Sequence, residues 1–295
     1  MPAIQQSTVD NIISDIENLP TPPVVYTRIN EAITDPNTSA YQIASIISED
    51  PAMSAKILRL SNSAFYGCSR EITSIKQATI TVGLEAIRSI ILSTSVFNAF
   101  NSQPHLAQFQ EDFWRHSLAT ATACRVLTWK LSSEWIRNVD RAFSVGLLHD
   151  IGKLVMVTYM PQEWEKILPV LTKGESPAFI IERDILGYTH AEVGAALAKR
   201  WNLPEFIQDA LAFHHFPHSS PKEGSLAPLV YAGNLLSHIV FDKDESELSE
   251  TDIDSMDQAV LELLKTNPEP FLGLKSALID EYSKSEVFLH IARGL

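Results

Sequence analysis

Residues 146–154 read GLLHDIGKL, and this stretch places a histidine and an aspartate side by side among apolar residues. Within one helix, neighbouring side chains point about 100° apart, so a single buried stripe does not shelter both His149 and Asp150. A buried, hydrogen-bonded histidine beside a solvated aspartate would satisfy the pattern. A metal site would satisfy it too, because imidazole and carboxylate both bind divalent metals and an apolar surround excludes water. The dipeptide by itself favours the first interpretation.

Helical periodicity extends from this stretch in both directions. Apolar residues recur at helical spacing along most of the chain, and one helix is expected over residues 140–160. Helix-start signals recur as well: Ser39 with Gln42, Ser74 with Gln77, Thr189 with Glu192, and Asp50 before Pro51. No segment alternates apolar and polar residues between hairpin turn signals. The sequence therefore predicts an all-α fold.

A polar stretch at residues 101–108, NSQPHLAQ, divides the predicted helices into two groups. We expect it to be a short linker. The expected organisation is an N-terminal helical bundle of about six helices over residues 1–104, followed by a second helical domain over residues 105–295.

Composition excludes several functional classes. The net charge of −13 disfavours a broad nucleic-acid surface. The two cysteines, Cys68 and Cys124, lie too far apart in sequence to indicate a disulfide framework, and they suit a reducing compartment. No apolar run is long enough to span a bilayer, and the N-terminus lacks the features of a secretory signal. We expect a cytoplasmic protein that binds neither nucleic acid nor membrane.

Five histidines of the second half share one context. Each lies at a predicted helix position and is flanked by apolar residues, as is the aspartate of the opening stretch. The six residues are His116, His149, Asp150, His190, His214 and His215. One such histidine is usually structural, but so many polar groups in an apolar core are costly unless they are paired or bind a metal. We therefore expect them to converge on one pocket. The remaining histidines, at 105, 218, 238 and 290, lie in linker-like or peripheral contexts.

The order of His116 and the pair His149–Asp150 resembles the signature of the HD superfamily of metal-dependent phosphohydrolases. The fuller pattern is similar to its HDOD branch, which is related to the HD-GYP proteins. The motifs that carry the resemblance are LPTPPVV, DPAMSAKILRLSNSAFYG, SIKQATITVGLEAIRSIIL, GLLHDIGKLVM, HAEVGAALAKRWNLP and FHH. They cover roughly residues 10–240, and the second domain is accordingly expected to be HD-like.

The resemblance implies a role for each matching residue. In catalytic HD proteins, residues matching His116, His149 and Asp150 bind a metal together with a later aspartate. In two-metal relatives that hydrolyse cyclic di-GMP, residues matching His190, His214 and His215 add ligands, and the aspartate bridges the two ions. A lysine matching Lys153 contacts phosphate there, so Lys153 and Asp150 are the expected catalytic residues.

The chain departs from the HD pattern where the late aspartate should fall, within LVYAGNLLSH. The candidates there are Gly233 and Asn234, and neither carries a negative charge. Asn234 is thus at best a degenerate ligand, since losing a carboxylate weakens divalent binding. A ligand set of histidine and carboxylate without cysteine suits iron or manganese better than zinc. No organic cofactor is expected.

Three functions are compatible with these features. The first is a bacterial signal-transduction regulatory module with a degenerate metal site, which acts through a signalling protein that the sequence does not identify. The second is an active metal-dependent phosphohydrolase that acts on a nucleotide or cyclic dinucleotide. The third is a structural protein whose histidines are hydrogen-bonded core residues. The resemblance favours the first.

Overall fold

Helices are the regular structure of the described part of the chain. The computed structural model describes residues 3–16, 19–21, 24–33, 35, 37–100, 104–131, 135, 137–242, 258–266, 271 and 274–292, and these contain no strand. The first six helices are α1 (Ala3–Asp15), α2 (Val24–Ile33), α3 (Ala40–Ser48), α4 (Pro51–Ser61), α5 (Ile75–Thr81) and α6 (Leu84–Phe100). The all-α prediction is confirmed.

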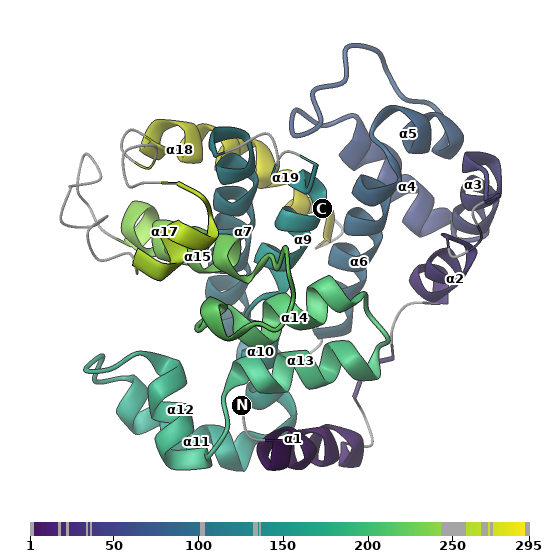
Figure 1. The fold of residues 1–295 in the computed structure, drawn as a ribbon. Coiled ribbons are helices and arrows are strands. Elements are labelled where there is room, and N and C mark those ends of the chain that lie inside the picture. Colours follow the sequence, from purple (N-terminus) through teal and green to yellow (C-terminus); the bar gives the residue numbers. More distant parts are fainter. Residues whose placement is uncertain are drawn as a thin grey trace.

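The second half begins with a 3₁₀ turn and the longest helix of the described chain. Its elements are η1 (Pro104–Leu106), α7 (Ala107–Lys130), α9 (Val139–Leu148), α10 (Ile151–Tyr159), α11 (Pro161–Leu171), α12 (Ala178–Leu186), α13 (His190–Arg200), α14 (Glu205–Phe213), η2 (Pro217–Ser219), α15 (Ala227–Asp242), α17 (Gln258–Leu263), α18 (Leu274–Ser285) and α19 (Val287–Ala292). Helix α7 is central, because α9, α15 and α18 all pack against it (Figure 1).

Local sequence signals begin these helices where they were expected. The Ser39 side chain accepts a hydrogen bond from the Gln42 amide, and the Gln42 side chain reaches back, which completes a capping box at α3. Thr189 and Glu192 form the same arrangement at α13. Asp50 caps α4 with Pro51 at its first position. Ser74 caps α5, but the Gln77 side chain bonds to the amide of Thr73, so this box is only half formed.

One predicted helix is wrong in a way that matters. Residues 140–160 form two helices, α9 and α10, with His149 and Asp150 at the junction. Asp150 has φ −98° and ψ 9°, outside the helical region, so the chain changes direction there. The 100° separation of neighbours in a continuous helix no longer applies, and both side chains face one pocket.

Several helix contacts join the predicted N-terminal bundle to the second half, and α6 against α9 is one of them. Helix α1 lies beneath α13, away from α2–α5 (Figure 1). Lys199 and Asp10 pair there at 2.6 Å, and the Trp201 indole donates to the Pro20 carbonyl at 2.6 Å. Helix α19 packs against α4 and α6. Part of the predicted linker, residues 101–103, lies outside the described residues, and the boundary at 104/105 stays a prediction.

Three glycines allow helices to approach one another closely around the histidine cluster. A Cβ atom on Gly146 would lie 2.7 Å from the Ala121 Cα, and one on Gly233 would lie 2.6 Å from the Cys124 sulfur. At Gly152 the clash is more severe, because a Cβ atom would lie 1.9 Å from the carbonyl oxygen of His190. Only glycine lets α10 cross the first turn of α13 at this separation, and that crossing brings Asp150 beside His190.

Among the described residues, no single helix combines the length and apolar character needed to cross a bilayer. The bent pair α5 and α6 meets those criteria only when the two helices are taken together.

Candidate metal centre

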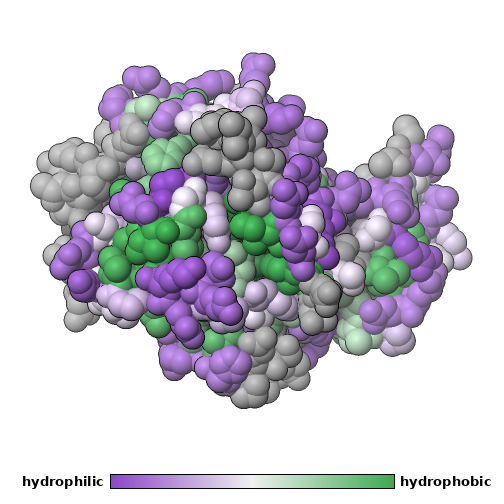
Figure 2. Space-filling model, turned by 90° about the horizontal axis from the view of Figure 1, so that it is seen from below, coloured by the Kyte–Doolittle hydropathy of each residue, from purple (hydrophilic) through white to green (hydrophobic). Residues whose placement is uncertain are grey.

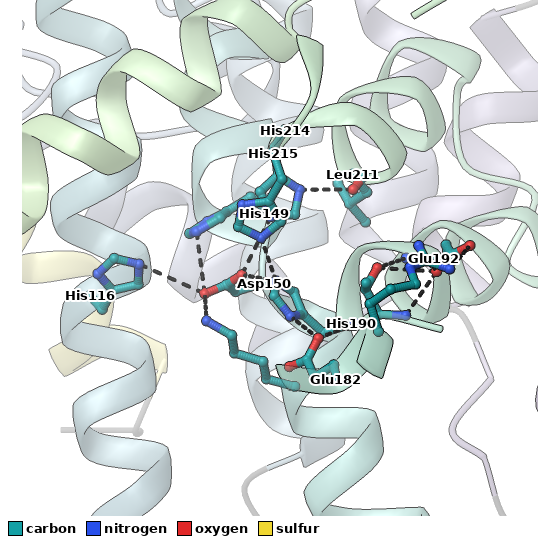
Figure 3. A network of polar contacts seen from close by, with 12 residues as sticks. His116, His149, Asp150, Glu182, His190, Glu192, Leu211, His214 and His215 are labelled. Atoms are coloured by element: carbon teal, nitrogen blue, oxygen red, sulfur yellow. Dashed lines mark hydrogen bonds and ion pairs between the residues drawn. The ribbon is translucent and has the colours of Figure 1, made fainter. Parts of the chain in front are cut away.

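Asp150 lies at the centre of the histidine cluster and is almost completely buried, with 2% of its surface exposed (Figure 3). Its Oδ1 lies 3.0 Å from Nε2 of His190 and 3.6 Å from Nε2 of His214. Its Oδ2 lies 3.4 Å from Nε2 of His149 and 3.8 Å from Nε2 of His116. The aspartate is therefore not solvated, and each of its oxygens faces two imidazole nitrogens.

Main-chain carbonyls orient two of the imidazoles. Nδ1 of His149 lies 2.8 Å from the Gly146 carbonyl oxygen, and Nδ1 of His214 lies 2.8 Å from that of Leu211. A carbonyl only accepts, so both Nδ1 atoms carry a proton and the Nε2 atoms keep their lone pairs. Both Nε2 atoms are buried and make no hydrogen bond. Unpaired buried nitrogens that face a carboxylate are what a metal site requires.

A carboxylate orients the third imidazole. Oε2 of Glu182, on α12, lies 2.6 Å from Nδ1 of His190 and also accepts from the His190 amide at 2.8 Å. Nε2 of His190 in turn lies 2.9 Å from Nε2 of His215. The His215 ring stacks on Phe179, with ring centroids 4.2 Å apart. Glu182 and the aromatic neighbour of His215 were not found from the sequence.

His116 lies on the more open side of the cluster. It is half-buried on α7, and its ring stacks on His238 from α15 with centroids 4.6 Å apart. His238 is exposed, as its peripheral context in the sequence indicates, yet its ring contacts a residue of the cluster. The signal that could have found it was its spacing, one helical turn after Asn234.

Burial and neighbouring charges control protonation in the cluster. Burial, reinforced by neighbouring His149, lowers the pKa of His116 to about 3, and burial lowers the pKa of His214 to about 4. Burial acts to raise the pKa of Asp150, but His149, Lys153 and His190 outweigh it and hold that pKa well below its usual range. Neutral imidazoles and an ionised carboxylate are the forms that bind metals, so the shifts of His116, His214 and Asp150 favour ligation near neutral pH, whereas Glu182 raises the pKa of His190 against the effect of burial.

The ligand atoms form two sets that share Asp150. One set is His116, His149 and Asp150, and the other is Asp150, His190, His214 and His215. Within each set, one ligand atom from each residue lies within 4.8 Å of all the others. The two sets come from α7, the α9–α10 junction, the start of α13 and the end of α14 (Figure 3). This donor set fits one or two divalent ions.

The structure distinguishes the two candidates for the late ligand. Gly233 faces α7 and approaches Cys124 and the carbonyl of Thr120, so there is no room at this position for a side chain that could bind a metal. Asn234 lies one turn before His238 on α15, and its Oδ1 is buried without a hydrogen bond. Lys153 lies at the same centre, where its Nζ donates to Oδ2 of Asp150 at 2.6 Å. The ligand roles of all these residues stay predictions.

Comparison with known proteins identifies the family. The model of the HDOD domain matches residues 19–217. An uncharacterised protein of Treponema pallidum is 27% identical over 226 residues, which are 76% of this chain and 43% of that protein. Ribonuclease Y of Oleidesulfovibrio alaskensis is 28% identical over 162 residues, which are 55% of this chain and 24% of the enzyme. The chain thus matches less than half the length of these relatives.

Solved structures show the same fold. The crystal structure of an HDOD domain protein with unknown function from Geobacter sulfurreducens has a TM-score of 0.75 and 22% identity, with 97% of this chain and 98% of that one covered. The chain belongs to the HDOD domain family, as its motifs indicated.

Proposed function

We propose that this HDOD protein is a signal-transduction regulatory module whose HD-type metal site is degenerate. The observation that carries the proposal is the pairing of a preserved centre with an altered late ligand. Asp150 and its imidazoles keep a metal-ligand arrangement, with unpaired Nε2 atoms on His149 and His214. An amide, Asn234, is the residue of α15 available where the HD pattern has a carboxylate.

The buried nitrogens weigh against a purely structural role. A core histidine that only stabilises the fold would use both ring nitrogens in hydrogen bonds, because an unpaired buried polar atom costs about 1–3 kcal/mol. His149 and His214 each leave one nitrogen unpaired, and both unpaired atoms face Asp150. A divalent cation supplies the missing partner for all three residues.

The chemistry of the donors favours iron or manganese over zinc. The ligands are imidazole nitrogens and carboxylate oxygens, without a thiolate. The buried Cys124 lies against Gly233, not in either ligand set. When bound, such an ion lowers the pKa of a ligated water and withdraws charge from a phosphoryl oxygen. The protein itself contributes oriented imidazoles, the Asp150 carboxylate and the Lys153 ammonium, a cationic side chain at this centre that can hold a phosphate.

The proposed loss of activity rests on a missing negative charge in the ligand set. With Asn234 in place of a carboxylate, the ligand set carries one anionic residue, Asp150, for as many as two divalent ions. We expect low metal occupancy and poorly oriented water, and hence weak or undetectable hydrolysis of cyclic di-GMP and nucleotides. The regulatory effect then arises from binding another protein.

The proposed partner is a signalling protein that binds in trans. Helices α11 and α12 lie low in Figure 1 and expose the apolar side chains of Leu168, Ile180 and Ile185. The face seen from below carries separate hydrophobic areas among hydrophilic residues (Figure 2). Patches of this kind suit a reversible protein contact.

An active phosphohydrolase is the second candidate, and the near-complete ligand set favours it. Ribonuclease Y, one relative, is named for the hydrolysis of RNA, but the net charge of −13 argues against RNA as the substrate here. The deciding experiment measures metal content by mass spectrometry and turnover of cyclic di-GMP, nucleotides and RNA with added Mn²⁺ or Fe²⁺. Robust turnover by the natural protein would reject the degenerate-site proposal in favour of this second one.

A further inference from the structure

Glu182 is a buried carboxylate whose hydrogen bonds, among the described residues, all come from His190. Its side chain has no exposed surface. Oε2 accepts hydrogen bonds from both the ring Nδ1 and the main-chain amide of His190, while Oε1 makes no hydrogen bond. Burying a carboxylate is costly unless it is paired, so the contact with His190 must offset that cost.

Arg183, next to Glu182, forms a second connection between α12 and α13 that does not involve His190. Arg183 of α12 pairs with Glu192 of α13 at 2.7 Å, and Glu192 completes the capping box with Thr189. This second connection holds the start of α13 without touching an imidazole of the cluster. Stability of the α12–α13 junction therefore does not require a carboxylate at position 182.

The contact of Glu182 differs from those of the other oriented histidines. Neutral carbonyl oxygens hold His149 and His214, whereas an anionic oxygen holds His190 at 2.6 Å. A carboxylate behind an imidazole fixes the ring in the tautomer that carries a proton on Nδ1, and it makes Nε2 a stronger electron donor. His190 belongs to the four-residue ligand set and not to the set of His116 and His149.

We propose that Glu182 is a positioning residue that holds Nε2 of His190 toward Asp150 and makes the four-residue set the tighter of the two metal subsites. This inference rests on the metal site proposed above. It assigns Glu182 no contact with the metal or with a substrate.

The test uses the full chain freed of metal and titrated with Mn²⁺. Glu182→Gln keeps an acceptor and removes the charge, and Glu182→Leu removes the acceptor as well. We expect the affinity of one ion to fall about 10- to 100-fold in Glu182→Leu, with a smaller loss in Glu182→Gln. The affinity of a second ion should change less than about twofold, since His116 and His149 do not contact Glu182.

A matched control separates positioning from stability. Glu192→Gln weakens the cap of α13 and its pair with Arg183 but leaves Glu182 and His190 in contact. It should lower the thermal midpoint without changing Mn²⁺ affinity. Equal losses of affinity in Glu192→Gln and Glu182→Leu would overturn the proposal, as would unchanged affinity in both Glu182 variants. If Glu182→Leu does not fold, the isosteric Glu182→Gln decides alone.

A spectroscopic measurement separates this inference from the proposed function. Nitrogen chemical shifts of the His190 ring in the metal-free protein should report a proton on Nδ1 in the natural chain and in Glu182→Gln. In Glu182→Leu they should report a mixture of the Nδ1 and Nε2 tautomers. Absence of Mn²⁺ and Fe²⁺ binding in the natural chain would reject the metal site, whereas a tautomer that ignores Glu182 would reject the positioning role alone.

Discussion

Replacement of Gly152 by alanine should separate α10 from α13 and damage the metal centre. A Cβ atom at this position would lie 1.9 Å from the carbonyl oxygen of His190 and 2.8 Å from the amide nitrogen of Gly194. Both atoms are main chain, so no side-chain rotation relieves the contact. The first separation must grow to at least 3.0 Å, and the helices must therefore part by about 1.1 Å.

The displacement acts directly on the ligands because Gly152 follows Asp150 by two residues and the obstructing oxygen belongs to His190. Ligand distances in metal sites tolerate about 0.2 Å, so a shift near 1 Å removes one residue from the set. We expect metal affinity to fall about 100-fold, and overpacking to cost about 3 kcal/mol of stability. That cost should lower the thermal midpoint by about 6–12 °C.

Gly194→Ala is the matched control on the opposite side of the same contact. Its Cβ atom would lie 3.3 Å from the amide nitrogen of Gly152 and 3.3 Å from Cγ2 of Ile151, a tight but tolerable separation. Circular dichroism melts and Mn²⁺ titrations of both variants supply the comparison. If Gly152→Ala melts and binds Mn²⁺ like the natural protein, the close crossing does not position Asp150 and the reasoning is refuted.

Three further predictions concern charge at the same centre. Asn234→Asp should raise metal content and turnover of cyclic di-GMP, because it restores the absent carboxylate; lower metal content, measured by mass spectrometry, would contradict this. Removing metal with a chelator should lower the thermal midpoint, and Mn²⁺ at 100 times its dissociation constant should restore about 2.7 kcal/mol, while no shift would argue against a bound ion. In metal-free protein, His116 and His214 have folded pKa values of about 3 and about 4, below the usual 6.5. The unfolded chain therefore binds more protons between pH 6.5 and about 4, so the free energy of unfolding should fall as pH drops through that window, by up to about 1.4 kcal/mol per pH unit for each histidine. Urea unfolding at several pH values measures this slope, and a stability independent of pH would count against neutral buried imidazoles.

Helix type, helix starts and family could all be predicted from residues close together in sequence. Apolar spacing and caps such as Asp50 and the Thr189–Glu192 pair depend on contacts three or four residues apart, so they are visible without a structure. The motifs also singled out the six residues that the structure brings together.

The centre's internal arrangement depended on contacts between distant segments. Periodicity predicted one helix through His149 and Asp150, because the bend at Asp150 follows from the packing of α10 against α13 and not from a local breaker. The sequence patterns did not single out Glu182, yet it is buried behind His190. These side chains lie far apart in sequence, and they come together only when α7, α10, α12, α13 and α14 pack. The distances set by that packing decide which side chains are close enough to bind the same metal ion.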